Sequence, residues 1–176
     1  MVEKDSAAQA TSGQKKHRIR WILEGAVLIT VVFALHLYQT RGAVSGKAPE
    51  IRGQLLDGTP VSLGEFRGQP VLLQFWAIWC PVCSLEQGSI HSIARDHAVL
   101  SIALEDGSAD ETRRWMANKG VSYRVILDPS GQISGRFGVN GVPTSMIIDA
   151  SGEIRFVEVG YTSEIGLRLR LWWVGR

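Results

Sequence analysis

The feature that most restricts the fold of this chain is an apolar run that ends at a pair of closely spaced cysteines. The run PVLLQFWAI, residues 70–78, carries no charge, which is typical of a β-strand buried on both faces. Pro81 follows shortly after it, within Cys80-Pro81-Val82-Cys83, and proline is favoured in the first turn of a helix. The sequence therefore predicts a buried strand followed by a helix that begins around Cys80, at the only 2 cysteines of the chain.

Strand and helix patterns alternate along the rest of the C-terminal part. A hairpin is predicted within residues 50–63, turning at Asp57-Gly58, and a helix that opens on Ser108 and ends at Gly120 follows a capping-box pattern. Further strands are predicted at 98–104, 122–128, 144–149 and 154–160, and the tail 163–176 favours a helix over a strand. This order predicts an α/β fold, with a mixed central sheet and helices on both of its faces.

Most of the large aromatic side chains are expected in the core. Phe75 and Trp76 lie inside the predicted buried strand, where aromatic residues are common. Trp115, Trp172 and Trp173 are also interpreted as packing residues rather than as a cage for a ligand.

The N-terminal part differs in composition from the rest. Residues 1–20 are polar and are predicted to be a disordered tail. Residues 21–40 are long and apolar enough to cross a bilayer as one helix, with Glu24 and His36 each about one turn from an end. A cleaved signal peptide is the rival interpretation, because small residues follow at 43–45, but its apolar part should be shorter. The prediction is an uncleaved membrane anchor.

Charge placement predicts the orientation of that anchor. The basic stretch KKHRIR precedes it, whereas Arg41 alone follows, so the N-terminus is expected in the cytoplasm. The remaining chain, a linker at 41–48 and a domain at 49–176, would then face the bacterial periplasm from the inner membrane. Residues 1–40 carry the whole net charge of +2, so the rest of the chain is neutral. A neutral domain offers no basic surface for nucleic acid.

The cysteine pair admits three interpretations. A structural disulfide across two residues closes a very short loop, which contributes little stability. A zinc site with His91 and His97 is disfavoured, because on one helix His91 would lie about 12 Å beyond Cys83. A redox pair explains more, because a sulfur at a helix N-terminus meets unpaired N–H groups that stabilise its thiolate. Cys80 would then attack and Cys83 would resolve the mixed disulfide.

The stretch FWAIWCPVC resembles the active-site segment of the thioredoxin superfamily. The predicted anchor, the extra hairpin, the spacing Cys80-x-x-Cys83-x-x-Glu86 and the segment Gly141-Val142-Pro143-Thr144 narrow this to bacterial membrane-anchored proteins of the TlpA/ResA type. The Cys-Pro-Val-Cys motif is most similar to ScsD-like disulfide oxidoreductases, which are associated with suppression of copper sensitivity. The resemblance covers residues 48–176 and implies a thioredoxin-like fold.

The resemblance also assigns site residues. It implies that Pro143 is a cis-proline packed against the disulfide, and that Trp79, Val142, Pro143 and Thr144 contact the substrate. Glu86 matches an acid that influences the protonation of the pair in related reductases. Its alternative interpretation is a solvated carboxylate favoured by the helix dipole.

Two residues depart from the pattern of the family. Gln74 stands where thioredoxin has a buried aspartate, so that proton-accepting role is vacant or passes to Glu86. Gly88 stands where relatives often have proline, which puts a kink of the helix in doubt.

The expected function is protein thiol–disulfide exchange, more often as a reductant, with a cytochrome c maturation or copper-stress client. The expected partners are cysteine-containing proteins, a membrane electron-transfer protein and the bilayer itself. No metal and no cofactor beyond the Cys80–Cys83 disulfide is expected. The rivals are a disulfide oxidase or isomerase, a copper carrier and a thiol peroxidase. Copper-carrier relatives space their cysteines by three and add a late histidine, which this chain lacks after His97.

Overall fold

The computed structural model describes residues 21, 23–31, 34, 44–104 and 107–176. The chain divides into two units, Met1–Arg41 and Gly42–Arg176. In the first unit, the described residues 21, 23–31 and 34 are helical. No described helix reaches the length and apolarity that a membrane crossing requires. The rest of the predicted anchor, residues 22, 32–33 and 35–40, lies outside the described residues, so the anchor stays a prediction.

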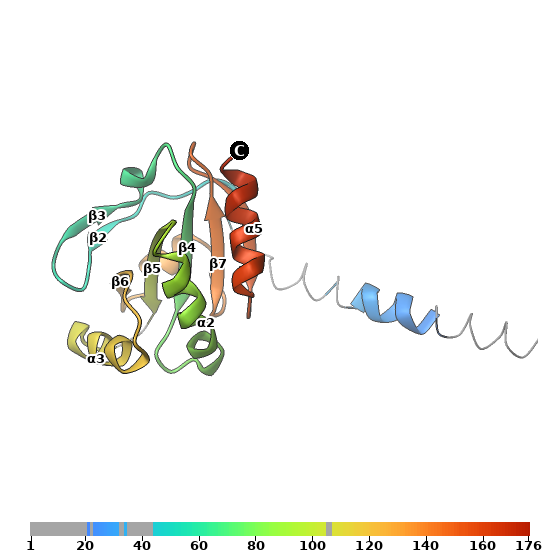
Figure 1. Ribbon diagram of the computed structural model, residues 1–176, viewed down its shortest axis with the longest axis horizontal. Helices are drawn as coiled ribbons and strands as arrows, with labels where there is room; N and C mark the ends of the chain where they lie inside the picture. The colour runs from blue at the N-terminus through green and yellow to red at the C-terminus, as the bar shows by residue number, and fades with distance from the viewer. Residues whose placement is uncertain (1–20, 22, 32–33, 35–43, 105–106) are drawn as a thin grey trace, which may run out of the picture. The chain divides into compact units, whose positions relative to one another are not determined.

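The second unit is built on a six-stranded mixed sheet of order β1-β8-β7-β4-β5-β6 (Figure 1). Strands β4, β5 and β6 are parallel, whereas β7, β8 and β1 continue the sheet antiparallel to their neighbours. The strands are β1 (Gly46–Lys47), β4 (Val71–Trp76), β5 (Ala98–Leu104), β6 (Arg124–Asp128), β7 (Thr144–Ile148) and β8 (Glu153–Val159). The predicted hairpin forms a separate pair, β2 (Arg52–Gln54) and β3 (Pro60–Ser62).

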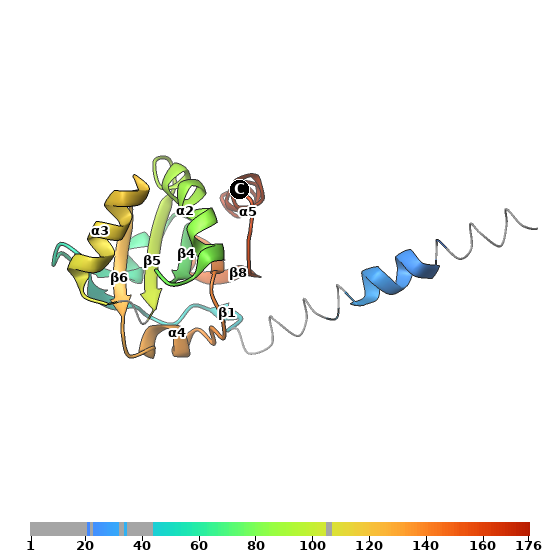
Figure 2. The same cartoon turned by 90° about the horizontal axis from the view of Figure 1, so that it is seen from below.

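The helices cover both faces of the sheet, with α2, α3 and α5 on one face and α4 on the other (Figure 2). They are η1 (Leu63–Phe66), α2 (Pro81–Ile93), α3 (Ala109–Lys119), α4 (Gln132–Arg136) and α5 (Glu164–Val174). The α3 boundaries follow the predicted caps, since Ser108 Oγ accepts the Glu111 N–H and Gly120 closes the helix with φ of 66°. The mixed sheet with helices on both faces is therefore confirmed.

Strand β4 is the centre of the domain because both of its faces are buried. Leu73 and Phe75 pack into the core beneath η1 and α4, where the Phe75 and Phe137 rings lie 5.5 Å apart. Leu72 faces α2 and α5, and Trp76 contacts Trp115 of α3 at 4.9 Å between ring centroids. The core assignments of these strand residues and of Trp115 are confirmed.

The structure also differs from the sequence-based expectations. Residues 46–47 pair with β8 and Ala48 is buried, so the folded domain includes part of the segment expected to be a linker. The short helix α4 stands where no element was expected. The packing role expected for Trp172 and Trp173 is wrong, because Leu167 and Leu171 occupy the inward face of α5 and leave the two indoles 51% and 69% exposed.

Candidate functional site

The two cysteines lie at the junction between β4 and α2. Cys80 is the N-cap of α2, with extended backbone angles, and Pro81 takes the first helical position, as predicted. The Sγ atom of Cys80 accepts the backbone N–H of Cys83 at 3.1 Å, and a disulfide joins the two residues. An unpaired helix N–H aimed at a sulfur stabilises a thiolate there when the disulfide is reduced.

Access to the disulfide is one-sided. The Cys83 side chain is fully buried, and Cys80 is 4% exposed. Around them, Trp79 and Val82 are exposed apolar side chains. Any partner that reaches the disulfide must therefore approach the Cys80 sulfur first, over a mostly apolar rim.

The loop before β7 completes that rim. The Val142–Pro143 peptide bond is cis, as the family resemblance implied, and the Val142 carbonyl oxygen lies 3.7 Å from Cys80 Sγ. Thr144 is buried, and its hydroxyl donates to the Gly141 carbonyl at 2.7 Å, so this side chain supports the loop from within. The loop places a main-chain carbonyl of Val142 beside the sulfur.

Glu86 lies one helical turn after Cys83 and is fully buried, so its interpretation as a solvated carboxylate is wrong. Its Oε2 accepts the side-chain amide of Gln74 at 3.4 Å, and its Oε1 accepts the backbone N–H of Thr162. Burial raises the pKa of Glu86 to about 7, while the hydrogen bonds from Thr162 and Gln74 act in the opposite direction. This carboxyl group can therefore take up or release a proton near neutral pH.

Glu86 sits over a polar row across the middle of the sheet. Gln74 of β4 has Ser101 of β5 and Ser145 of β7 as its register partners, and all three side chains are buried. The Trp76 indole N–H donates to the Ser101 hydroxyl. Among the described residues, Gln74 Oε1 and Ser145 Oγ have no hydrogen-bond partner. The row leaves unused hydrogen-bonding capacity directly beneath Glu86.

Sequence reasoning missed Thr162, Ser101 and Ser145 as neighbours of the site. The two serines carried a signal, since each is a polar residue within an apolar strand. Thr162 carried none, because its contact with Glu86 spans 76 residues of sequence.

His91, one of the two histidines in the zinc interpretation, contacts the backbone before β6. His91 Nδ1 accepts the backbone N–H of Ser122 at 3.0 Å. In residues 21, 23–31, 34, 44–104 and 107–176, no three His, Cys, Asp or Glu side chains come together in a group that could hold a metal ion.

Comparison with known proteins agrees with this geometry. The sequence profile of the AhpC/TSA family matches residues 44–157. The thiol:disulfide interchange protein DsbE of Vibrio cholerae is 34% identical over 97 residues, which are 54% of this chain and 52% of that protein. The thiol-disulfide oxidoreductase ResA of Bacillus thuringiensis is 27% identical over 137 residues, 76% of this chain and 79% of that protein.

Solved structures extend the likeness to the fold. A thioredoxin family thiol:disulfide interchange protein from Chlorobium tepidum has a TM-score of 0.67 at 26% identity, over 76% of this chain and 99% of that one. A putative DsbE from the same organism has a TM-score of 0.68 at 27% identity, over 76% of this chain and 99% of that one. The expected thioredoxin-like fold and the expected enzyme class, a thiol–disulfide oxidoreductase, are both confirmed. With its profile match running from β1 into β8, the chain belongs to the AhpC/TSA family.

Proposed function

We propose that this chain reduces disulfides of other proteins in the bacterial periplasm, with Cys80 as the nucleophile and Cys83 as the resolving thiol. The observation that carries the proposal is the position of Cys80 Sγ, at the N-terminus of α2 and 3.7 Å from the Val142 carbonyl oxygen. This position supports Cys80 as the nucleophile, because a reactive thiolate needs N–H donors that stabilise its charge and a surface that the substrate can reach. Cys83 is buried, so a substrate cannot reach it directly.

The reaction runs in two balanced steps. The Cys80 thiolate attacks one sulfur of the substrate disulfide, so that a mixed disulfide forms and the second substrate sulfur leaves as a thiolate. Cys83 then loses its proton and attacks Cys80 Sγ, which leaves the Cys80–Cys83 disulfide and a reduced substrate. A membrane electron-transfer partner, which donates two electrons and two protons, restores the dithiol.

Glu86 is proposed to handle the proton of Cys83. It follows Cys83 by one helical turn, and residues three apart on a helix are neighbours. A carboxyl group with a pKa of about 7 accepts a proton readily at neutral pH, a role that Gln74 cannot fill.

Substrate contact is proposed for Trp79, Val142 and Pro143. Trp79 offers an exposed ring one residue before Cys80, and the Val142 carbonyl can accept a main-chain N–H of an extended substrate segment. Thr144 would act indirectly, by holding the loop through Gly141.

Location is proposed from the sequence. The apolar run 21–40 would anchor the chain in the inner membrane, and the basic residues 15–20 would keep its N-terminus in the cytoplasm. The proposed client is a protein of copper stress, in line with the resemblance of the Cys-Pro-Val-Cys motif to ScsD-like oxidoreductases, or one of cytochrome c maturation.

The reductant direction is supported by the residues between the cysteines. Pro81 and Val82 carry no charge, so no cation on this dipeptide adds to the stabilisation of the Cys80 thiolate. Equilibration of the Cys80/Cys83 couple against glutathione or dithiothreitol tests the direction. A reduction potential near about −270 mV or lower supports a reductant, and one near about −120 mV would establish a disulfide donor instead.

A further inference from the structure

Helix α5 has two apolar faces, although only one of them packs against the domain. Leu167 and Leu171 point inward and are buried against Leu72, Ile90 and Ile93. The outer face of α5 consists of Ile165, Leu169, Trp172 and Trp173, which are 72%, 60%, 51% and 69% exposed. These four residues follow one another at helical spacing, so they form one stripe. A surface helix normally carries polar residues there, and the stripe therefore points to something that covers it.

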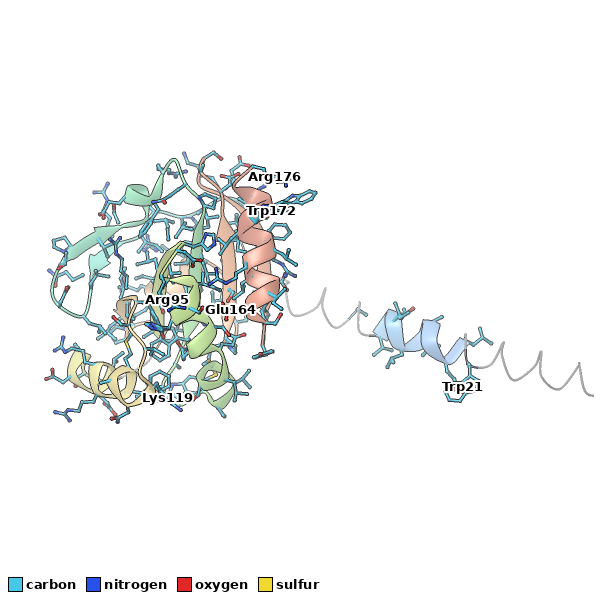
Figure 3. All side chains as sticks on the ribbon, in the orientation of Figure 1. Trp21, Arg95, Lys119, Glu164, Trp172 and Arg176 are labelled. Atoms are coloured by element: carbon cyan, nitrogen blue, oxygen red, sulfur yellow. A yellow bond between two sulfur atoms is a disulfide. The ribbon has the colours of Figure 1, made fainter. Side chains whose placement is uncertain are left out.

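The chemistry of this stripe is that of a membrane interface. Tryptophan is enriched at the level of lipid headgroups, where its ring is apolar and its N–H remains hydrated. The Arg176 guanidinium lies 3.6 Å from the centroid of the Trp172 ring, and both residues lie at the C-terminal end of α5 (Figure 3). Of the three arginines from 163 to 176, Arg168 pairs with Asp96 and Glu164, and Arg170 pairs with Glu158, so Arg176 is the cation that lies against the stripe. Indole rings beside an arginine match a phospholipid surface, with apolar chains beneath phosphates.

Helix α5, which carries the stripe, packs beside β8, the strand that also pairs with the first strand of the domain. Arg170 ties α5 to β8, with an ion pair to Glu158 at 2.7 Å and a cation–π contact to Phe156 at 5.7 Å. Strand β1, at the start of the domain, pairs with the same strand β8. Figure 2 shows β1, β8 and α5 together at this edge.

The tether between the predicted anchor and the domain is short. The Val44 N–H already donates to the Phe137 carbonyl of the domain, so only residues 41–43 separate residue 40 from the fold. Three extended residues and their connections reach at most about 14 Å. If residues 21–40 anchor the chain, this length limits how far Val44 and β1 can lie from the headgroup layer.

We propose that the outer face of α5 docks on the phospholipid headgroup region of the membrane that holds the anchor. The proposal rests on the proposed anchor. It also leaves the redox pair accessible, because the two indoles and the cysteines lie toward opposite ends of β4. Gly175 is adjacent to Pro70, just before β4, whereas Cys80 follows its other end.

The test uses the full chain in nanodiscs of ordinary or brominated phosphatidylcholine, since bromine quenches tryptophan fluorescence on contact. Comparing wild type with the double variant Trp172→Phe/Trp173→Phe isolates the emission of the two indoles. We expect brominated lipid to remove most of that emission. Comparing wild type with Trp21→Phe reports separately on the anchor, because Trp21 is the first residue of the apolar run.

The outcomes separate the two proposals. Quenching of Trp21 without quenching of Trp172 and Trp173 overturns docking and leaves the anchor. Quenching of the two α5 indoles alone overturns the anchor, and with it docking on the membrane that holds the anchor, and no quenching at either place overturns both. If brominated lipid leaves the α5 indoles bright while an aqueous quencher such as acrylamide also fails to reach them, a protein covers the face, such as a second copy, and docking is overturned.

A second pair of variants tests the stripe itself. Ile165→Glu with Leu169→Glu should lower the lipid quenching of the α5 indoles several-fold and leave that of Trp21 unchanged. Leu85→Glu on α2 is the matched control, because Leu85 is 73% exposed and lies near the redox end of the domain. Full quenching in the double glutamate variant, with an unchanged circular dichroism spectrum, would overturn the proposal.

Discussion

Replacing Glu86 with glutamine should make the unfolding free energy less dependent on pH between about 4.5 and 7. Burial raises the pKa of Glu86 from 4.5 to about 7 in the folded protein. Within that window the folded chain holds a proton that the unfolded chain has released, so the stability contributed by the protonated group falls as pH rises. Below pH 4.5 both states are protonated, and above pH 7 both are ionised.

The size of the effect follows from the same interval. Each pH unit between the folded and unfolded pKa corresponds to about 1.4 kcal/mol, so the wild type should lose about 3 kcal/mol relative to Glu86→Gln across the window. Glutamine keeps the shape of the protonated acid, and the loss of one acceptor at its amide nitrogen changes the stability by an amount that does not depend on pH, so the pH-dependent part of the difference is specific for the charge.

The assay is denaturant unfolding of the oxidised protein, followed by tryptophan fluorescence at several pH values from 4.5 to 8. Glu164→Gln is the control, because its hydrogen bond to Arg168 lowers the pKa of Glu164 and moves its titration below the window. That variant should differ from wild type by a constant amount. If the Glu86→Gln difference is also constant, Glu86 is ionised in the folded state and the argument from burial is refuted.

Three further changes have defined expectations. Cys83→Ser should accumulate a mixed disulfide with a substrate protein on non-reducing gels, whereas Cys80→Ser should form none; trapping by Cys80→Ser would reverse the two roles. Asp128→Ala removes the acceptor of three hydrogen bonds at 2.8–3.0 Å around the start of α4, and denaturant unfolding should show a loss of about 2–3 kcal/mol. A loss below about 0.5 kcal/mol would mean that water replaces the carboxylate. Gly120→Ala should lower the unfolding free energy by about 1 kcal/mol, because φ of 66° strains the backbone of any residue with a side chain. The added methyl group meets no neighbouring side chain within 4 Å, so the loss reports backbone strain alone. An unchanged denaturation midpoint would contradict this backbone strain.

The position of the cysteine pair between a strand and a helix could be predicted because its signals are local. An uncharged run predicts a buried strand, Pro81 predicts the first turn of α2, and the cysteines fall between the two. The caps Ser108 and Gly120 likewise act within a few residues of the helix that they bound. Segments without such a pattern were missed, including the short helix α4 and the two-residue strand β1, which is regular only through its pairing with the distant strand β8.

The state of Glu86 shows where local reasoning ends. From the sequence alone, a carboxylate in the first turns of a helix is equally consistent with a solvated residue. Its burial depends on Gln74 of β4 and Thr162 before α5, which are 12 and 76 residues away in the chain. The orientation of α5 also depends on tertiary packing. From the sequence alone, either of its two apolar faces could point into the core.

The sequence by itself determined the fold class, the position of Cys80 and Cys83 between a strand and a helix and the boundaries of the helices with strong caps, because these depend on side chains close together in the chain. The tertiary structure alone decided that Glu86 is buried and that Trp172 and Trp173 are exposed. Desolvation depends on which distant segments exclude water from a group, and no pattern within one segment specifies that.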